Sequence, residues 1–326
     1  MKIALILNNG ILNDLFTSKA IDKLRTLGEV AINPGEPTIE NIKETIKGAD
    51  IAITSWGNPL MEKEILDECP NLKLLMHAAG SVKPVVTDEL WNRGIRVCAS
   101  TKPLGMGVAE TALAFAIAAC KNFFELNDII HNGGYELKNI KEFYELTVGV
   151  VSAGYVGRHM IKLLQNFGVE VLLYDPYVTD AQAEEMGCTK AELNELLEKS
   201  DVVSLHAPSI PATNHMINAD TLRLMKKDAV LINTARGSVV DEKALYEHMA
   251  AGNLKYACLD VYDPEPIEAD NPLRTLKNVI MTPHIAGLAA NGKLRIGAHS
   301  AEQIEHFIKG EALECEVTKE MLDTIA

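Results

Sequence analysis

The chain has 326 residues, with 47% apolar and 23% charged side chains, and a formal net charge of −14 from 45 acidic and 31 basic residues. This length allows two domains with separate cores, and the composition is ordinary for a globular protein. The acidic balance argues against a nucleic-acid or anionic-membrane partner, since both need basic patches. An anionic small molecule would need a local cationic pocket.

The first third of the chain alternates short apolar runs with amphipathic helical patterns. Strands are predicted at residues 2–7, 29–32, 50–54, 72–76 and 95–98, and helices between them at 18–27, 39–47 and 87–93. This alternation predicts a doubly wound α/β domain with a parallel sheet. The run at 2–7 passes directly into Asn8 and is too short for a signal peptide.

Six cysteines are scattered along the chain, and no two of them form a C-x-x-C pair. Their spacing fits no zinc site, so we expect no metal. Cys120 and Cys258 lie in apolar runs, which indicates small buried thiols. We therefore expect reduced cysteines and a cytoplasmic protein.

A long helix is expected at residues 108–125, bridging the first series of elements to a second one. Its most apolar part, residues 108–120, is shorter than the roughly 20 residues that a bilayer requires. Because that stretch is apolar over nearly its whole length, it exceeds what one buried face needs. We expect it to lie near the interface of a homodimer.

A second series of strands is predicted at residues 147–151, 169–174, 201–205, 229–233, 256–259 and 279–282. The first of these runs into a dinucleotide-binding turn, G-x-G-x-x-G, in which Ser152 replaces the first Gly. Gly154 would let the backbone approach a pyrophosphate, and Gly157 would let helix pack on strand. Ser152 must adopt a turn that Gly adopts more easily. An ordinary βα turn without a ligand is the alternative.

Asp175 closes the second strand of this series, where an acid accepts hydrogen bonds from the ribose hydroxyls of a dinucleotide. The residues after Asp175 include no Arg that would take a 2′-phosphate. This pattern favours NAD over NADP.

Three charged residues follow the last three strands. Arg236 follows the strand at 229–233, Glu265 follows 256–259, and His284 follows 279–281. In open α/β sheets, ligands bind at the edge that the carboxyl ends of the strands form. An Arg fork holds a carboxylate, a His exchanges a proton near neutral pH, and a Glu orients the His. The set predicts a reaction at a carbon next to a carboxylate. A solvent-capped His and a surface Arg are the alternatives.

Together these segments resemble the NAD-dependent D-2-hydroxyacid dehydrogenases. The resemblance covers nearly all of the chain, from Ala-Ala-Gly80-Ser-Val through Val-Ala-Glu110, the Gly-rich turn and Leu-His206-Ala-Pro to the Arg–Glu–His set. It implies the reduction of 2-keto acids to D-2-hydroxy acids with NADH, or the reverse. His284 would be the acid/base, Glu265 its partner and Arg236 the substrate clamp.

The resemblance also implies two doubly wound parallel-sheet domains. Residues 100–285 would form a Rossmann domain that binds NAD, and residues 1–99 with 286–326 would form a flavodoxin-like substrate domain. The substrate domain would be discontinuous, because the last helix, at about residues 289–309, would return to it. The family comparison points to a homodimer as well.

Cofactor contacts are implied at the ends of several strands. They fall on Gly154, Tyr155, Val156, Gly157, Asp175, His206, Ala207, Pro208, Thr213, Thr234, Ala235, Asp260, His284 and Gly287. Tyr155 and Val156 would contact the pyrophosphate, and Asp260 would meet the nicotinamide amide. Asp260 ends a buried strand, where a carboxylate without a partner would be costly.

Substrate contacts are implied on the loop after the fourth strand, where the N–H groups of Gly80 and Ser81 would receive the substrate carboxylate. Lys83 stands where family members usually carry Asp, and we interpret it as a solvated loop residue. Together with His77, it could instead add positive character to the pocket. Trp56 and Met106 are candidates either for a wall beside the substrate side chain or for packing between domains.

Other functions on this scaffold remain open. An NAD-sensing, non-catalytic protein of the corepressor type can keep the Arg–Glu–His set. Formate or phosphite oxidation is a third possibility, but formate enzymes of this superfamily pair Gln with the His, so Glu265 disfavours them. The expected partners are a small 2-keto or 2-hydroxy acid and a second copy of the chain, with no nucleic acid and no membrane.

Overall fold

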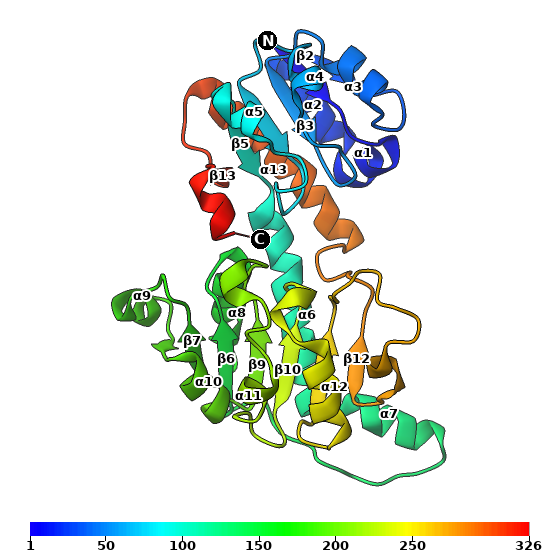
Figure 1. The fold of residues 1–326 in the computed structure, drawn as a ribbon, viewed down its shortest axis with the longest axis vertical. Helices are drawn as coiled ribbons and strands as arrows, with labels where there is room; N and C mark the ends of the chain where they lie inside the picture. Colours follow the sequence, from blue (N-terminus) through cyan, green and yellow to red (C-terminus); the bar gives the residue numbers. More distant parts are fainter. Residues whose placement is uncertain (326) are drawn as a thin grey trace. The chain divides into compact units, whose positions relative to one another are not determined.

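The computed structural model describes residues 1–325, which fold into two compact units. The first unit combines Met1–Gly105 with the segment from Gly287 onwards, and the second is Met106–Ala286. The chain therefore passes out of the first unit, forms the second, and returns (Figure 1). The first crossing, between Gly105 and Met106, lies inside the helix α6 (Thr101–Cys120).

The first unit contains a six-stranded sheet with the order β13-β5-β4-β3-β1-β2. Its strands are parallel apart from β13, which pairs antiparallel with β5. The order of the first five strands, 2-1-3-4-5, is that of flavodoxin-like folds. The elements are β1 (Lys2–Leu5), α1 (Asn9–Leu15), α2 (Ser18–Leu27), β2 (Glu29–Ile32), α3 (Ile39–Ile46), β3 (Ile51–Thr54), α4 (Lys63–Leu66), β4 (Leu74–His77), α5 (Asp88–Asn92), β5 (Arg96–Ala99), α13 (Ala290–Lys309), β13 (Glu316–Val317) and the 3₁₀ turn η4 (Glu320–Asp323).

Both faces of this sheet are buried by helices. One apolar cluster contains residues of α3, α4 and α5, and the other contains residues of α1, α2 and α13. The central strands β3 and β4 are buried along their whole length, which suits a parallel sheet covered on both sides. α13 ends at Gly310, whose φ of 73° gives the left-handed C-cap that Gly provides.

The second unit contains a seven-stranded sheet with the order β12-β11-β10-β9-β6-β7-β8, and all its strands pair in parallel. This is the order of a Rossmann sheet, extended by one strand. The elements are α7 (Phe123–His131), β6 (Thr147–Val151), α8 (Tyr155–Leu164), β7 (Glu170–Tyr174), α9 (Asp180–Glu185), β8 (Thr189–Lys190), α10 (Leu193–Lys199), β9 (Val202–Leu205), η1 (Pro211–Thr213), α11 (Ala219–Leu222), β10 (Val230–Asn233), η2 (Gly237–Val239), α12 (Glu242–Ala250), β11 (Tyr256–Leu259), η3 (Pro272–Thr275) and β12 (Val279–Met281).

This sheet is also covered on both faces. Residues of α10, α11 and α12 form one apolar cluster, and residues of α6 (Thr101–Cys120) and α8 form the other. The predicted fold class, two doubly wound parallel sheets, is confirmed. The two strands that the sequence pattern misses, β8 and β13, have two residues each. A period of two cannot be recognised in so short a run.

The helix predicted at residues 108–125 is wrong at both ends. α6 begins earlier, at Thr101, with Pro103 in its first turn, where a missing N–H costs nothing. It ends at Cys120, because Asn122 has a φ of 58° and turns the chain before α7 begins. Two helices therefore replace the single helix that was expected.

The greater length of α6 changes one inference. With 20 residues and a mean hydropathy of 1.5, it is long and apolar enough to cross a bilayer by length and composition alone. A helix in a protein core meets the same criterion. In α6, the alanines at 109, 112, 116 and 119 are fully buried in the second unit's apolar cluster. Packing within this unit thus accounts for one side of α6, and 44% of its apolar window is buried. The homodimer interface expected at residues 108–120 stays a prediction.

Candidate active site

The second unit collects the predicted chemical residues at one edge of its sheet. Because β6, β7, β9, β10, β11 and β12 are parallel, the segments that follow them all leave from the same edge. These segments carry, in spatial order along that edge, His284, Glu265, Arg236, His206, Gly154 and Asp175. All of the predicted catalytic residues thus belong to one unit.

His284 lies in a strained loop after β12. Its φ of 51° is uncommon for a residue other than Gly and costs about 1–3 kcal/mol. Its N–H donates to the carbonyl oxygens of Asp260 and Thr282, at 2.9 and 3.0 Å, and so holds this conformation. Strain of this kind persists where surrounding structure enforces it, as at functional sites. The side chain remains half exposed, so a small molecule can reach the ring.

Glu265 contacts the His284 ring directly. Its Oε2 lies 2.7 Å from Nδ1 of His284, and its Oε1 accepts from the N–H of Tyr262 at 3.0 Å. A carboxylate can only accept in such a pair, so Nδ1 carries the hydrogen. The other ring nitrogen, Nε2, is the one left for proton exchange. The predicted pairing of these two residues is therefore present in the structure.

Asp260 holds the loop that carries His284. Its carboxylate is fully buried, and it accepts from the Thr282 hydroxyl at 2.5 Å and from the N–H groups of Ile285 and Ala286, both at 2.9 Å. Bonds of this kind to a charged acceptor are stronger than those between neutral groups. The costly carboxylate at the end of β11 thus has protein partners, which sequence reasoning did not foresee.

Arg236 lies in a tight turn after β10. The Asn233 side chain closes this turn: its amide donates to the Arg236 carbonyl at 2.9 Å, and its oxygen accepts from the Ala235 N–H at 3.1 Å. Burial lowers the pKa of Arg236, and the nearby Glu265 carboxylate opposes that shift. An Arg keeps its charge in proteins, so a half-buried cation lies close to the Glu265–His284 pair.

Gly237 explains how the Arg236 turn comes so close to the Glu265 segment. A Cβ added at Gly237 would lie 1.9 Å from the carbonyl carbon of Tyr262 and 2.0 Å from its oxygen. Only Gly permits this contact between two backbones. Tyr262 in turn donates its hydroxyl to the carbonyls of Leu259 and Thr282, which joins the ends of β11 and β12. The three loops form one packed assembly.

The Gly-rich turn has the geometry that its sequence requires. Ser152 has a φ of 77°, so it occupies the conformation that a Gly would adopt more easily. A Cβ on Gly157 would lie 2.0 Å from the Ser152 carbonyl oxygen, whereas a Cβ on Gly154 would meet nothing within 4 Å. Helix α8 therefore packs tightly on the turn, while open space remains at its N-terminus, where a phosphate binds in such folds.

Asp175 is buried at the end of β7 and is bound to this turn. One carboxylate oxygen accepts from the Ala153 N–H at 2.7 Å and from the Ser152 hydroxyl at 3.4 Å, and the other accepts from the Tyr177 N–H at 2.8 Å. Each carboxylate oxygen has two lone pairs, so acceptor capacity remains for a ligand hydroxyl. The contacts fix the carboxylate in place beforehand.

Two polar atoms next to this edge are buried without a hydrogen-bond partner among residues 1–325. They are Nδ1 of His206 and Oγ1 of Thr234. The other ring nitrogen of His206 lies 3.0 Å from the Ser204 hydroxyl. Burial lowers the pKa of His206 to about 4, so its ring is neutral. Buried polar groups are nearly always paired, and these two therefore indicate a polar ligand.

The remaining predicted cofactor residues lie on the same loops. Thr213 donates its hydroxyl to the carbonyl of Pro208 at 2.5 Å and ties η1 to the end of β9. Ala207 and Val156 pack against apolar clusters. Ala235 follows β10, Tyr155 begins α8, and Gly287 is the first residue of the chain's return to the first unit.

The predicted substrate residues lie in the first unit. Gly80 and Ser81 follow β4, and the Leu104 side chain lies 2.9 Å from where a Gly80 Cβ would stand. Trp56 packs partly buried against the unit's apolar cluster. Lys83 is partly buried, and its backbone N–H donates to the Ser81 hydroxyl at 3.4 Å. Met106 is exposed and belongs to the second unit.

Sequence reasoning missed several residues that shape the site. Asn233, Tyr262 and Thr282 do not react, but each closes a loop that carries a charged side chain. The signal for Asn233 was available, since Asn at a strand end commonly folds its side chain onto the following turn. For Tyr262 and Thr282 the signal lies in contacts between segments, which a single sequence does not contain.

Comparison with known proteins places the chain in a family. The family model of the D-isomer specific 2-hydroxyacid dehydrogenase, NAD binding domain, matches residues 113–286. A D-3-phosphoglycerate dehydrogenase of Methanocaldococcus jannaschii is 34% identical over 307 residues, which cover 93% of this chain and 58% of that protein. This chain therefore spans little more than half the length of that relative.

Two further proteins match over nearly equal lengths. A glyoxylate reductase of Korarchaeum cryptofilum is 32% identical over 281 residues, which cover 84% of each chain. The crystal structure of a D-lactate dehydrogenase of Treponema pallidum has a TM-score of 0.79 and 26% identity, and covers 98% of this chain and 100% of its own. With the Gly-rich turn and the Arg236, Glu265 and His284 loops in place, this chain belongs to the D-isomer specific 2-hydroxyacid dehydrogenases and carries their NAD-binding domain.

Proposed function

We propose that the protein interconverts a 2-keto acid and a D-2-hydroxy acid, with NAD(H) as the redox partner. The observation that supports this most directly is the 2.7 Å contact between the His284 ring and Glu265, with the half-buried Arg236 cation beside it. Proton donor, carboxylate partner and cationic clamp are the groups that reduction next to a carboxylate needs. Residues 100–285 would form the cofactor domain, and residues 1–99 with 286–326 the substrate domain.

His284 is the acid/base in this proposal. Because Nδ1 is bound to Glu265, Nε2 holds the proton that passes to the keto oxygen, or takes it back in the reverse direction. The carboxylate holds the ring in this tautomer and orientation. The strained loop, held by Asp260, keeps the ring from turning away. A fixed ring raises the fraction of encounters in which the proton is aligned with its acceptor.

Arg236 is the clamp. A guanidinium presents two parallel N–H groups to a carboxylate, and it can grip the carboxylate and the keto oxygen together. Its burial strengthens both contacts, because water screens them less. As charge grows on the keto oxygen, the same cation stabilises it. We propose Trp56, Gly80 and Ser81 as further substrate-binding residues; they lie in the first unit.

The cofactor fits the residues at the sheet edge. NADH supplies the hydride when it is bound. The open N-terminus of α8 would take the pyrophosphate, with Tyr155 and Val156 beside it, and the preset carboxylate of Asp175 would accept from the ribose hydroxyls. The buried Nδ1 of His206 and Oγ1 of Thr234 would find partners on the ligand.

The experiment is NADH consumption with a panel of 2-keto acids of different side chains, including glyoxylate, pyruvate, hydroxypyruvate and branched 2-keto acids. We expect turnover with at least one member, and a D-configured product by chiral chromatography. An NAD-sensing, non-catalytic protein would bind NADH and consume none. That outcome would overturn the proposed activity.

NADH should be preferred over NADPH. Asp175 would repel a 2′-phosphate, and its fixed position leaves no room for adjustment. Comparison of kcat/KM for the two cofactors with the same keto acid tests this. Equal values, or a preference for NADPH, would remove the assigned role of Asp175.

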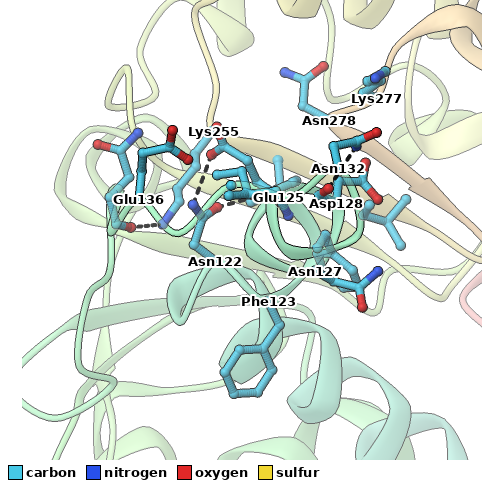
Figure 2. Close-up of a pocket in the computed structure, with 16 residues that line it drawn as sticks. Asn122, Phe123, Glu125, Asn127, Asp128, Asn132, Glu136, Lys255, Lys277 and Asn278 are labelled. Carbon is cyan, nitrogen blue, oxygen red and sulfur yellow. Dashed lines mark hydrogen bonds between the residues drawn. The ribbon is translucent and has the colours of Figure 1, made fainter.

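We propose that the second partner is another copy of the chain. The expected interface at residues 108–120 of α6 is kept, and we extend it to α7, which begins at Phe123, and to the segment after α7. This surface exposes Phe123, Ile130, Tyr135 and Leu137, and the last two are 87% and 82% exposed. It borders a cavity of about 1110 Å³ that Asn122, Glu125, Asp128 and Lys255 help to line, and the Phe123 ring points away from these polar groups (Figure 2). Apolar side chains beside a polar rim are typical of an interface.

Sedimentation at micromolar concentration tests this. We expect a stable dimer, and a shift towards monomer in the double variant Tyr135→Ser/Leu137→Ser. The matched control is Tyr177→Ser, since Tyr177 is also exposed but lies at the cofactor edge. A wild-type monomer would refute the proposal. We also propose that the protein is cytoplasmic and that its six cysteines are reduced.

A further inference from the structure

His77 is a buried histidine that the chemistry above does not use. It is the last residue of β4, its exposed fraction is 2%, and the next four residues lead to Ser81. Burial lowers its pKa to about 4, although a hydrogen bond to the Ser81 backbone partly offsets this effect. The ring is therefore neutral. It cannot contribute a charge to a substrate site, and its role must come from its hydrogen bonds.

The ring joins two loops. Its Nδ1 lies 2.9 Å from the hydroxyl of Thr54, the last residue of β3, and the ring also bonds the backbone of Ser81. A neutral imidazole has one donor and one acceptor. The Thr54 hydroxyl can donate to Nδ1, and the remaining ring N–H can then donate to the Ser81 carbonyl. Both ring nitrogens are thus used, and the tautomer is fixed.

Hydrogen bonds from neighbouring segments hold three successive carbonyl groups of the 78–82 loop. The Ala78 carbonyl accepts from the Ser55 hydroxyl at 2.8 Å, the Ala79 carbonyl from the Ser100 N–H at 3.0 Å, and the Gly80 carbonyl from the Thr101 hydroxyl at 3.2 Å. In a trans peptide, the N–H of the next residue points opposite to the carbonyl. The N–H groups of Gly80 and Ser81 therefore point away from the elements that hold their carbonyls.

His77 fixes the next peptide in the same way. A ring N–H donated to the Ser81 carbonyl turns the Val82 N–H to the opposite side. Three successive N–H groups, of Gly80, Ser81 and Val82, then depend on anchored carbonyls for their direction. Successive backbone N–H groups in a turn form a concave anion site. The His77 ring provides the hydrogen bond to the Ser81 backbone in this series.

We propose that His77 is a positioning residue for substrate binding: by bridging Thr54 and the Ser81 backbone, it aims the amide groups of the 78–82 loop at the substrate carboxylate. The proposal rests on the proposed function, because it takes this loop as the carboxylate site. His77 acts through the loop and not on the reacting atoms. Its loss should therefore weaken binding of the carboxylate and leave the reaction of bound substrate nearly intact.

The test compares His77→Leu, which removes both ring bonds, with His77→Gln, which keeps a side-chain donor. We expect His77→Leu to raise KM for the best keto acid about 10-fold or more, the scale of one lost hydrogen bond. Its kcat should stay within about threefold of wild type, and NADH affinity should not change. His77→Gln should recover most of the KM. Oxamate affinity for the NADH complex, measured by fluorescence, should follow KM.

The matched control is His299→Leu, a buried histidine of the same unit whose ring faces the Ser100 hydroxyl and the Glu314 carboxylate. It should change the melting temperature without changing KM. If His77→Leu keeps KM within twofold, or lowers kcat at constant KM, the proposal is wrong. If His77→Leu does not fold, His77→Gln and His77→Asn decide the question, because the Asn side chain is too short to reach Ser81. A KM near the wild-type value in His77→Gln with a raised KM in His77→Asn would support the proposal. A wild-type KM in His77→Asn would contradict it.

Amide hydrogen exchange separates this proposal from the proposed function. Exchange at the bonded amides of Ala78 and Ser100, which donate to the carbonyls of Thr54 and Ala79, should be faster in His77→Leu than in wild type, whether or not a substrate has been found. Unchanged exchange would show that His77 does not hold the loop. A wild-type enzyme that turns over no keto acid would instead overturn the proposed function and leave the exchange result standing.

Discussion

Arg236 shows how local surroundings give a common residue a special task. It is half-buried in a turn that Asn233 closes, and the charge of Glu265 acts on it. Glu265 already accepts from the Tyr262 N–H and binds the His284 ring. The guanidinium therefore keeps donors for a ligand, and its burial makes an anionic ligand more favourable than water.

Arg236→Lys should fail as a conservative change. An ammonium is a point charge and cannot bind two oxygens of a planar group in parallel. Loss of one charged bond should cost about 1.5–3 kcal/mol, which is roughly a 10- to 100-fold loss in kcat/KM. NADH affinity should survive. Steady-state kinetics with the best keto acid and a fluorescence titration with NADH measure both.

The control for that variant is Arg274→Lys, because Arg274 binds the carbonyls of Ile267 and Glu268 on an exposed loop. It should keep wild-type kinetics. If Arg236→Lys also keeps them, Arg236 is not the clamp. If it loses NADH binding instead, the residue has a structural role.

Two buried histidines should make stability depend on pH. Burial lowers the pKa of His77 and of His206 from 6.5 to about 4, so the unfolded chain takes up protons that the folded chain refuses. Stability is therefore complete above about pH 6.5 and is lost as the pH falls towards 4. Each residue should contribute on the order of 1 kcal/mol per pH unit in this window.

Urea unfolding between pH 7 and 4.5 measures this slope, and His206→Gln removes one of the two groups. The variant should show a smaller loss of stability per pH unit than wild type, although it is less stable at pH 7. An equal slope in both proteins would contradict a lowered pKa of His206 in the folded state.

At the scale of elements, the Gly-rich turn joins β6 to α8 through a strained residue. Ser152 has a φ of 77°, and its hydroxyl makes only a long contact with Asp175, at 3.4 Å. Asp175 keeps stronger bonds from the Ala153 and Tyr177 N–H groups. The main contacts of this turn therefore do not depend on the Ser152 side chain, although Ser152 is strained.

Ser152→Gly should stabilise the second unit by roughly 0.5–1 kcal/mol, because Gly adopts this φ without strain and the gain exceeds its added entropy when unfolded. NADH affinity should change less than about threefold. Calorimetry should show a higher melting temperature for the transition of this unit. Ser152→Ala keeps the strain and loses the hydroxyl, so it should show no such rise. A lower melting temperature in Ser152→Gly would contradict this account.

The elements themselves were largely predictable. Strands β1, β6 and β10 each contain a run of apolar residues because both faces of each sheet are buried, and such runs are visible in one sequence. The start of α6 could not be predicted, because Pro103 and Gly105 indicate a helix break in a sequence pattern, although Pro is tolerated in a first helical turn. The break at Asn122 depends on a positive φ that tertiary contacts impose, including the Tyr256 hydroxyl on its side chain.

The site was predictable only in part. Arg236, Glu265 and His284 could be named from their places after three strands, because parallel strands present their carboxyl ends at one edge. The contacts that hold those side chains in place could not be predicted from the sequence. Asp260 uses its carboxylate on the His284 loop, and His77 bonds Thr54 and Ser81 across two loops. Such contacts depend on which segments meet, and a single sequence does not encode that visibly.

At the scale of the whole molecule, the chain builds two doubly wound units, each with its own sheet and cores. The proposed cofactor residues and all three charged residues lie in the second unit, and the proposed backbone donors Gly80 and Ser81 lie in the first. This division predicts that variants in the two units change different kinetic constants. Changes at His77 should act on KM, whereas changes at His284 should act on kcat.

The most direct test of the central claim is the rate of NADH oxidation by wild type and by His284→Ala, measured with the best 2-keto acid at saturating concentrations. The account predicts a loss of about 10²-fold or more in kcat, the usual contribution of a general acid, with NADH affinity unchanged. Activity near the wild-type level in His284→Ala would contradict the account, because no proton would then have to come from His284.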